Sequence, residues 1–283
     1  MSEVEQVGIV GGGFMGSGIA ESVARAGIAV HVYEPRDAPL ERSRERIAAS
    51  VDRAVSGGKL EAGDAEALKG RVTWTTDIGR LTQADVVVEA VVEDLAVKRA
   101  VFEQLDATVK PGALLTSNTS SIPIADLAAA TERPESVLGL HFFSPVPVMK
   151  LVEVVVALGT ADEAVARAEA FATALGKTPI RAGDRAGFIV NALLIPYMTS
   201  AVRMFEEGFA TREAIDEGMR LGCGHPMGPL TLCDFVGLDV VLAVADSLYE
   251  EFRRPEYAAP PILRRMVSAG RLGRKTGHGF YEH

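Results

Sequence analysis

The sequence predicts an α/β fold in which a doubly wound, mostly parallel sheet is followed by a smaller all-α domain. Three observations predict it. In the first half of the chain, short β-branched runs alternate with longer segments of helical periodicity, as in parallel sheets. A glycine-rich segment, residues 11–16, lies between the first such run and the first helical segment. Beyond residues 183–187, every segment has helical spacing.

The strands of the first domain are short apolar runs. We expect them at Val7–Val10, Ala29–Tyr33, Val72–Trp74, Asp85–Glu89, Ala113–Thr116, Val137–His141, Leu151–Val156 and Pro179–Arg181. The helices between them repeat apolar residues every three or four positions. We expect them at Met15–Ala26, from about Leu40 to Gly57, at Leu95–Ala107 and near Ala161–Leu175. Because strands alternate with helices, neighbouring strands should pair in parallel.

The second domain is expected to begin where the alternation stops. The segment Gly183–Gly187 is the best candidate boundary, which gives domains of residues 1–184 and 185–283. Helices are expected at Phe188–Glu207, Thr211–Leu221, Leu238–Glu251 and Pro261–Ala269.

Composition excludes several classes of protein. The chain has 283 residues, of which 48% are hydrophobic and 24% charged, and no run approaches the roughly 20 apolar residues of a membrane helix. Acidic residues in Met1–Glu5 are unlike a signal peptide, so we expect a cytoplasmic protein without a membrane partner. The formal charge of −9 provides no field that would attract nucleic acid. Cys223 and Cys233 form neither a disulfide framework nor a metal site.

The glycine-rich segment matches the pattern G-x-G-x-x-G in the strand–loop–helix context that a dinucleotide site requires. Such a loop lets backbone N–H groups and a helix N-terminus approach a pyrophosphate, which makes the predicted sheet Rossmann-type. The loop residues expected to contact the cofactor are Gly11, Gly13, Phe14, Met15 and Gly16. A loop that merely connects strand to helix is the alternative.

The end of the second predicted strand bears on which cofactor binds. Glu34 stands about 20 residues beyond the glycine loop, where an acidic residue bonds the ribose hydroxyls of NAD. Its charge would repel the 2′-phosphate of NADP. Arg36, two residues later, could reach that phosphate, so the sequence favours NAD and leaves NADP open.

One of the five histidines stands out as a catalytic candidate. His141 ends a strand and precedes a stiff, proline-containing loop, and Glu153 lies 12 residues on in an otherwise aliphatic strand. Burying a carboxylate without a partner is costly, and His141 is the nearest logical partner if the loop reverses the chain. Glu153 would then orient the imidazole, which could take the proton of a secondary alcohol while hydride leaves for the cofactor. A purely structural ion pair is the alternative.

Two further polar groups are ambiguous on local pattern alone. The segment Ser117–Ser121 follows a strand, so its hydroxyls should lie at the carboxyl end of the sheet, where ligands bind. The same string would also form a good turn or helix N-cap. Asn191 is a lone amide near the start of an apolar helix, where capping or core hydrogen bonding competes with a catalytic role.

Taken together, these residues resemble the L-3-hydroxyacyl-CoA dehydrogenase family and, in length and detail, its bacterial 3-hydroxybutyryl-CoA dehydrogenase branch. The similarity extends over essentially the whole chain, in several independent motifs that occur in family order. These motifs are GGGFMGSGIA at 11–20, VVEAVVEDLAVK at 87–98, SNTSSIPI at 117–124, LHFFSPVPVMKLVEVV at 140–155, GFIVNALLIPY at 187–197, GHPMGPLTLCDFVGLD at 224–239 and KTGHGFY at 275–281.

The resemblance implies roles for individual residues. His141 would be the catalytic base and Glu153 its partner, with Ser120 and Asn191 in contact with the substrate. Further residues would contact the cofactor, namely Glu93, Lys98, Ser120, Ser144 and Lys275. Ser50 and Lys59 would help to hold the CoA moiety. The chain departs from the family at Ser144, which stands where the motif HFFNP usually has asparagine.

The resemblance also implies an activity and an assembly. The expected reaction is the reversible NAD-linked oxidation of a short-chain (3S)-3-hydroxyacyl-CoA, without a metal, in a homodimer formed by the helical domain. The same chemistry on 3-hydroxyadipyl-CoA or on a carrier-protein thioester is an alternative. A nucleotide-binding relative that has lost turnover is a third hypothesis, from a different class.

Overall fold

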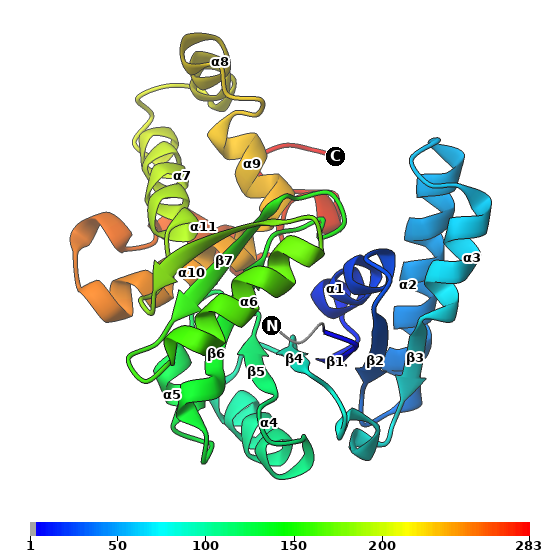
Figure 1. Cartoon of the computed structure of the whole chain (residues 1–283). Helices are drawn as coiled ribbons and strands as arrows, with labels where there is room; N and C mark the ends of the chain where they lie inside the picture. Colours follow the sequence, from blue (N-terminus) through cyan, green and yellow to red (C-terminus); the bar gives the residue numbers. More distant parts are fainter. Residues whose placement is uncertain (1–3) are drawn as a thin grey trace. The chain divides into compact units, whose positions relative to one another are not determined.

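The structure, a computed structural model, describes residues 4–283. The described chain contains one eight-stranded sheet with the strand order β3-β2-β1-β4-β5-β6-β7-β8 (Figure 1). Its strands are β1 Gln6–Val10, β2 Ala29–Tyr33, β3 Val72–Thr75, β4 Val86–Glu89, β5 Leu114–Ser117, β6 Val137–Phe142, β7 Leu151–Val156 and β8 Thr178–Gly183. Every neighbouring pair is parallel except β6 and β7, which are antiparallel. The predicted doubly wound, mostly parallel sheet is therefore confirmed.

Helices connect the strands and cover the sheet (Figure 1). They are α1 Phe14–Arg25, α2 Asp37–Ser56, α3 Ala62–Gly70, α4 Leu95–Thr108, α5 Ile124–Ala128 and α6 Asp162–Ala174, with short 3-10 turns η1 Ile78–Leu81 and η2 Pro134–Ser136. Helices α3 and α5 were not predicted from the sequence. Only two side chains of α3 are buried, and α5 has only five residues, so neither helix contains an apolar repeat long enough to be recognised in the sequence.

The core of this part of the chain lies between the sheet and its helices. Val7 and Ile9 of β1 are fully buried, as are Ile19 and Val23 of α1, and all four belong to one apolar cluster. Burial of such side chains is worth about 1.5–3 kcal/mol each. This packing fixes β1 relative to α1, and with it the loop of residues 11–13 that joins them.

The chain divides between Asp184 and Arg185 into two compact units, the second of which is helical. Its helices are α7 Val190–Glu206, α8 Arg212–Cys223, α9 Pro229–Val236, α10 Leu238–Phe252 and α11 Pro261–Ser268, with 3-10 turns η3 Pro255–Tyr257 and η4 Arg274–Thr276. The expectation that every element after residue 187 is helical is confirmed. Helix α9 was not predicted, because its eight residues begin at Pro229, directly after a segment rich in glycine and proline.

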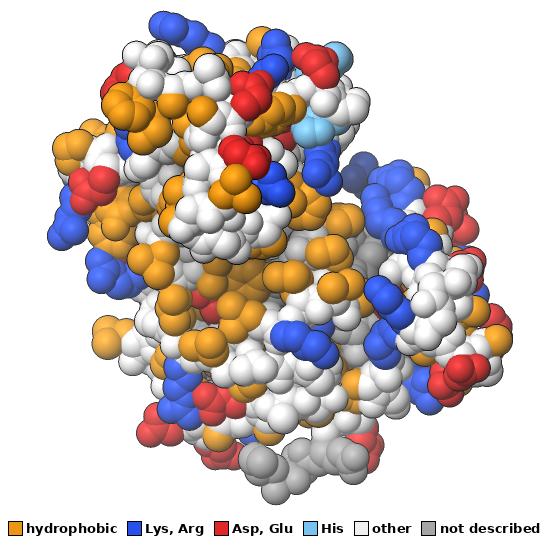
Figure 2. Space-filling model, turned by 90° about the horizontal axis from the view of Figure 1, so that it is seen from above, with side chains coloured by type: hydrophobic (Ala, Val, Ile, Leu, Met, Phe, Trp, Pro, Cys, Tyr) orange, Lys and Arg blue, Asp and Glu red, His pale blue; other side chains and the backbone are white. Residues whose placement is uncertain are grey.

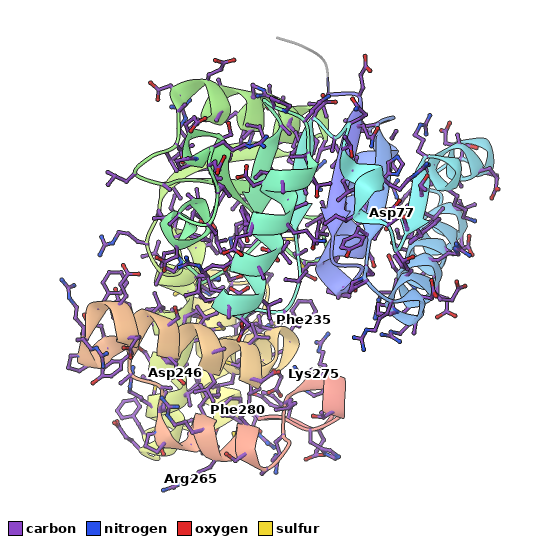
Figure 3. All side chains as sticks on the ribbon, turned by 90° about the horizontal axis from the view of Figure 1, so that it is seen from below. Asp77, Phe235, Asp246, Arg265, Lys275 and Phe280 are labelled. Atoms are coloured by element: carbon purple, nitrogen blue, oxygen red, sulfur yellow. The ribbon has the colours of Figure 1, made fainter. Side chains whose placement is uncertain are left out.

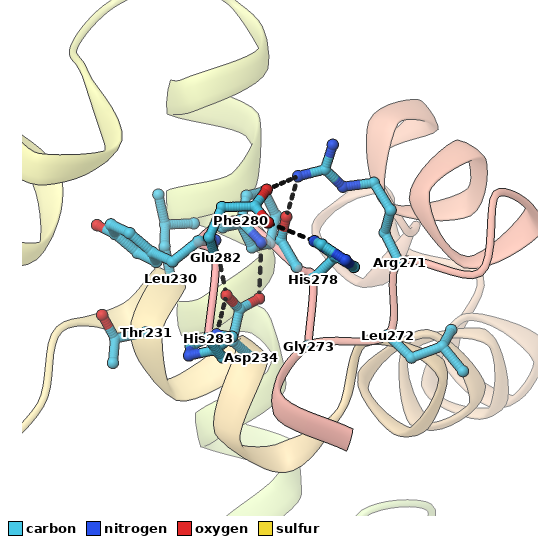
Figure 4. Close-up of polar contacts among 12 residues, drawn as sticks. Leu230, Thr231, Asp234, Arg271, Leu272, Gly273, His278, Phe280, Glu282 and His283 are labelled. Atoms are coloured by element: carbon cyan, nitrogen blue, oxygen red, sulfur yellow. Dashed lines mark hydrogen bonds and ion pairs between the residues drawn. The ribbon is translucent and has the colours of Figure 1, made fainter. Parts of the chain in front are cut away.

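A buried carboxylate fastens the last residues of the second unit to α9. The oxygens of Asp234 accept hydrogen bonds from the backbone N–H groups of Phe280 and Tyr281, each at 2.8 Å (Figure 4). The ring of His283 approaches the same carboxylate at 2.9 Å. Glu282, next in the segment, pairs with His278 and Arg271. These contacts hold a segment that contains no helix or strand after residue 276.

The described part of the chain contains neither a membrane-spanning helix nor a cluster of metal-binding side chains. Within residues 4–283, no helix is both long and apolar enough to cross a membrane. No cluster of three or more His, Cys, Asp or Glu side chains in that range could hold a metal ion. Cys223 is exposed and Cys233 buried, and both are free thiols. Of the two acidic residues in Met1–Glu5, from which a cytoplasmic protein was expected, Glu3 lies outside the described residues.

His31, on β2, is expected to make the stability of the folded state fall at low pH. Its Nδ1 atom is buried without a hydrogen-bond partner among the described residues. Burial lowers the pKa of the imidazole, and the nearby charge of Arg80 lowers it further. The folded state therefore favours the neutral ring, whereas the unfolded chain binds a proton near pH 6.5. The stability that this ring provides is present above that pH and is lost as the pH falls.

We expect His31→Phe to reduce this acid sensitivity. Between about pH 7.5 and about pH 5.5, the melting temperature of the variant should fall by about 2 °C less than that of the wild type. The exposed His278 provides a control, since His278→Gln should keep the wild-type difference. Equal pH slopes for wild type and His31→Phe, measured by thermal unfolding, would show that His31 does not titrate on unfolding.

Candidate active site

The glycine loop follows β1 at the carboxyl edge of the sheet, where two glycines are required by close contacts. Gly11 has φ +106°, and a Cβ there would lie 2.5 Å from the carbonyl oxygen of Ala90. A Cβ on Gly16 would lie 1.8 Å from the carbonyl oxygen of Gly11. By contrast, a Cβ on Gly13 would meet nothing within 4 Å. The loop therefore packs against the protein backbone at Gly11 and Gly16, and leaves space for a ligand beside Gly13.

The open side of this loop suits a pyrophosphate. Helix α1 has Gly13 as its N-cap, without a side-chain cap and without an acidic residue in its first turn. Its first N–H groups and the positive end of the helix dipole are therefore directed at the open side. Phe14, at the start of the helix, is exposed, and Met15 packs against the core. The residues present fit a dinucleotide phosphate at this position.

Glu34 lies at the end of β2 next to the same loop. Its Oε1 atom accepts a hydrogen bond of 2.7 Å from the backbone N–H of Gly12. Arg46 of α2, which was not among the predicted site residues, donates to the carbonyl oxygen of Gly12 at 3.1 Å. The loop is thus held from both sides by charged groups. Arg36 is exposed at the N-cap of α2.

His141 and Glu153 lie opposite each other on the antiparallel pair β6 and β7. The Nδ1 atom of His141 is 2.7 Å from Oε2 of Glu153. Both side chains are almost fully buried, at 4% and 1% exposure, so the carboxylate is shielded from water where it contacts the ring. Because the carboxylate of Glu153 accepts a hydrogen bond from Nδ1–H, the lone pair of a neutral imidazole lies on Nε2.

The loop after β5 approaches that second nitrogen. Oγ of Ser120 lies 3.0 Å from Nε2 of His141. Asn118, in the same loop, accepts the backbone N–H of Phe142 at 2.8 Å through Oδ1, which joins the loop to the end of β6. Thr119 accepts two N–H groups within the loop, so the string does form a turn. It does not cap a helix, because the N-cap of α5 is Pro123.

A buried ion pair between Lys98 and Glu89 is connected to the Ser120 loop through Glu93. Lys98 and Glu89 are 1% and 0% exposed, and Nζ of Lys98 lies 2.7 Å from Oε1 of Glu89. The ammonium is also 3.3 Å from Oε2 of Glu93. Glu93 in turn accepts N–H groups of the loop at Ser120 and Ser121. The structure therefore places Lys98 inside the protein, and Glu93 between Lys98 and the loop.

These contacts set the ionisation of Glu93. Partial loss of water raises the pKa of the carboxyl group, but the positive charge of Lys98 and the hydrogen bonds from residues 119–121 outweigh it. The net pKa lies below its usual value, so Glu93 stays negatively charged at neutral pH.

A cavity of about 330 Å³ lies between α1, α2 and the loop after β6. Pro145, Val146 and Pro147 form one wall. Arg46, Ser50 and Arg53, one turn apart on α2, line the opposite side. Figure 2 shows Lys and Arg side chains gathered over α2 and α3, at the right of the view.

Two predicted residues, Lys59 and Ser144, do not line this cavity. Lys59 is exposed beyond the end of α2, where its backbone N–H bonds the carbonyl oxygen of Ala54. Ser144 is exposed and precedes the cavity wall by one residue. The structure brings neither into contact with His141.

Asn191 and Lys275 belong to the second unit. Asn191 lies in the first turn of α7, where it is half-buried, and the N-cap of that helix is Ile189, so Asn191 is not the cap. Lys275 lies in η4 (Figure 3), and its ammonium contacts both carboxylate oxygens of Asp239 at 2.5 Å.

Comparison with known proteins agrees with this architecture. The family model for the NAD-binding domain of 3-hydroxyacyl-CoA dehydrogenase matches residues 6–185, and the model for its C-terminal domain matches residues 187–283. A protein of Mycobacterium tuberculosis named 3-hydroxybutyryl-CoA dehydrogenase is 54% identical over 282 residues, which cover 99% of each chain.

Solved structures give the same result. The crystal structure of M. tuberculosis FadB2 superposes with a TM-score of 0.99 at 54% identity, covering 100% of both chains. The structure of (S)-3-hydroxybutyryl-CoA dehydrogenase PaaH1 from Ralstonia eutropha has a TM-score of 0.95 at 43% identity, covering 99% of both. The chain therefore belongs to the 3-hydroxyacyl-CoA dehydrogenase family.

Proposed function

We propose that the chain catalyses the reversible, NAD-linked oxidation of a short-chain (3S)-3-hydroxyacyl-CoA, typified by 3-hydroxybutyryl-CoA, to the 3-oxoacyl-CoA. One observation carries the proposal. In the His141–Glu153 pair, Nδ1 of His141 faces the carboxylate and Nε2 lies 3.0 Å from Oγ of Ser120, at the edge of the sheet where the glycine loop opens. The relatives that share this fold over the whole chain are named as dehydrogenases of such substrates.

In this mechanism, Nε2 of His141 takes the proton of the substrate hydroxyl. Glu153 fixes the tautomer and, as a buried carboxylate 2.7 Å from Nδ1, stabilises the imidazolium that forms. Ser120, within hydrogen-bond distance of Nε2, orients the hydroxyl for this transfer. In the reverse direction, His141 returns the proton to the alkoxide. Asn191 is proposed to contact the thioester end of the substrate.

The glycine loop with Glu34 is proposed to hold NAD, which when bound supplies the acceptor for the hydride. The open N-terminus of α1 would receive the pyrophosphate, and the charge of Glu34 would disfavour a ribose 2′-phosphate. Glu93 and Lys98 are proposed to shape the cofactor site, with Lys98 acting through Glu93. Ser144 and Lys275 are proposed as additional cofactor contacts.

The cavity beside α2 is proposed to receive part of the CoA moiety. Its two arginines would offset the phosphate charges, and Ser50 would donate a hydrogen bond. Lys59, exposed beyond the helix, is proposed to act at longer range on the same phosphates. Such local positive groups would allow a chain of net charge −9 to bind the phosphates of CoA.

The two units are proposed to have different functions. Residues 1–184 form the NAD-binding domain, and residues 185–283 complete the substrate site and form a homodimer. Leu193, Phe209 and Leu221 of the second unit are each more than 70% exposed, which fits an apolar contact between copies. Light scattering coupled to size-exclusion chromatography should give twice the mass of 30.0 kDa. A cytoplasmic location stays a prediction.

Following NADH consumption with acetoacetyl-CoA tests the proposed activity. We expect turnover at about 1–10³ s⁻¹, and NADH preferred to NADPH by at least about tenfold. Longer, carboxylated and carrier-protein thioesters should react less well. A higher kcat/KM for one of these would move the substrate class to that thioester. Binding of NADH without turnover on any of them would overturn the enzymatic function.

A further inference from the structure

We propose that Lys177 is a positioning residue for the loop of residues 143–150, which joins the two members of the His141–Glu153 pair and forms a wall of the cavity beside α2. No role in binding or catalysis follows for Lys177 from the site described above. The inference rests on the contacts of its side-chain ammonium with this loop.

The position of Lys177 is fixed by its backbone. It lies between α6 and β8, and its N–H bonds the carbonyl oxygen of Ala172 at the end of α6. The next residue, Thr178, donates to the carbonyl oxygen of Lys150 at 2.7 Å and begins the parallel ladder with β7. The ladder therefore places Lys177 directly beside the end of the loop.

The side chain of Lys177 contacts the backbone of the loop. Its Nζ atom donates to the carbonyl oxygen of Val146 at 2.5 Å and to that of Met149 at 2.8 Å. Within the loop, the carbonyl oxygen of Pro145 accepts the N–H groups of Val148 and Met149. The lysine thus bonds two carbonyl groups that this turn leaves free.

Keeping an ammonium in this place is costly. Lys177 is only 8% exposed, and none of the described carboxylates lies within ion-pair distance of its Nζ. Burial lowers the pKa of the group, the charges of Lys150 and Arg25 lower it further, and Glu21 opposes them more weakly. An apolar side chain would be cheaper to bury, but it would leave both carbonyl oxygens without a donor.

The loop that Lys177 holds contacts both halves of the proposed site. Pro145 and Pro147 line the cavity of about 330 Å³, and the Val146 side chain is buried in the core beside Gly18. At the start of the loop, the ring of Phe143 lies 4.6 Å from that of His141, measured between centroids. Loosening the loop should therefore weaken acyl-CoA binding more than cofactor binding, because Pro145, Val146 and Pro147 line the cavity proposed for CoA, whereas Ser144 is the only residue of the loop proposed to contact the cofactor.

Amide hydrogen exchange on the full chain without ligand tests the proposal independently of activity. In Lys177→Met, exchange in residues 143–150 should accelerate at least about tenfold, the equivalent of about 1.4 kcal/mol, while residues 11–16 exchange as in the wild type. Lys150→Met removes an exposed lysine from the same loop and should leave both segments unchanged. Unchanged exchange at 143–150 in Lys177→Met would overturn the proposal.

The kinetic arm rests on the proposed function. In Lys177→Met, the KM for acetoacetyl-CoA should rise about tenfold, while kcat falls less than about threefold and the Kd for NADH rises less than about threefold. Lys177→Arg, which can donate to both carbonyl oxygens, should recover KM to within about threefold of the wild type. Equal losses in KM and in NADH affinity would indicate general destabilisation and contradict a positioning role. A wild type inactive on acetoacetyl-CoA would refute the proposed function, and the exchange result would still decide the role of Lys177.

Discussion

Replacing His141 by glutamine is expected to lower kcat for acetoacetyl-CoA reduction by about 10²- to 10⁴-fold. The glutamine amide can donate a hydrogen bond to the buried Glu153 and so preserve packing, but it cannot exchange a proton at neutral pH. The loss therefore reports the proton-transfer role of the imidazole. Steady-state consumption of NADH at saturating acetoacetyl-CoA gives the measurement.

Two measurements show whether this loss is specific. NADH should bind His141→Gln with the wild-type Kd, since the glycine loop and Glu34 lie on other elements. His278→Gln, a change of the same type at an exposed position, should retain full activity. Turnover of His141→Gln within about threefold of the wild type would remove His141 from the mechanism.

Gly16→Ala is expected to have the largest effect on the fold of the cofactor site. The new methyl group would lie 1.8 Å from the carbonyl oxygen of Gly11, which is backbone and cannot rotate away. The loop must shift or α1 must move off β1, at a cost of about 1–3 kcal/mol or more. We expect a fall of several degrees in melting temperature and at least about a 100-fold rise in the Kd for NADH.

Gly13→Ala is the matched control, because it adds the same methyl group three residues earlier. Gly13 has φ −68°, which alanine adopts readily, and the methyl group would meet no protein atom within 4 Å. The melting temperature should therefore stay within about 1 °C of the wild type. The methyl group would occupy the open side of the loop, so the Kd for NADH should still rise about tenfold. An unchanged Kd in Gly13→Ala would place the pyrophosphate elsewhere.

Most elements of the fold could be predicted because hydrophobic periodicity is a local signal. The strand Ala29–Tyr33 and the antiparallel partner Leu151–Val156 were predicted with the bounds that the structure has. The three helices that were missed are short or begin at a proline, and long-range packing rather than a local apolar stripe determines them. Their positions depend on contacts such as that of Asp184, which accepts the first N–H groups of α5.

The site could be predicted where a buried polar group has few possible hydrogen-bond or ion-pair partners. Glu153 in an aliphatic strand required a partner, and the structure places His141 opposite it. The same argument applied to Glu89, at the end of an equally apolar strand, would have suggested the buried pair with Lys98. That inference was not made from the sequence, and Lys98 was instead expected only at the cofactor.

Other contacts could not be predicted because they depend on strand register and on loop paths. Nothing in the local pattern indicates that Asn118 accepts the N–H of Phe142, or that Arg46 reaches the glycine loop from α2. The same holds for the ammonium of Lys177, which lies 31 residues from Val146 in sequence.

His141 and Glu153 are proposed to act as one acid–base unit, and a double-mutant cycle shows whether they do. We would measure kcat for oxidation of 3-hydroxybutyryl-CoA in the wild type, His141→Gln, Glu153→Gln and the double variant. If the carboxylate acts only through the imidazole, the double variant should be no slower than His141→Gln, within about threefold. If the two losses instead multiply, or if Glu153→Gln turns over at the wild-type rate, the account is contradicted.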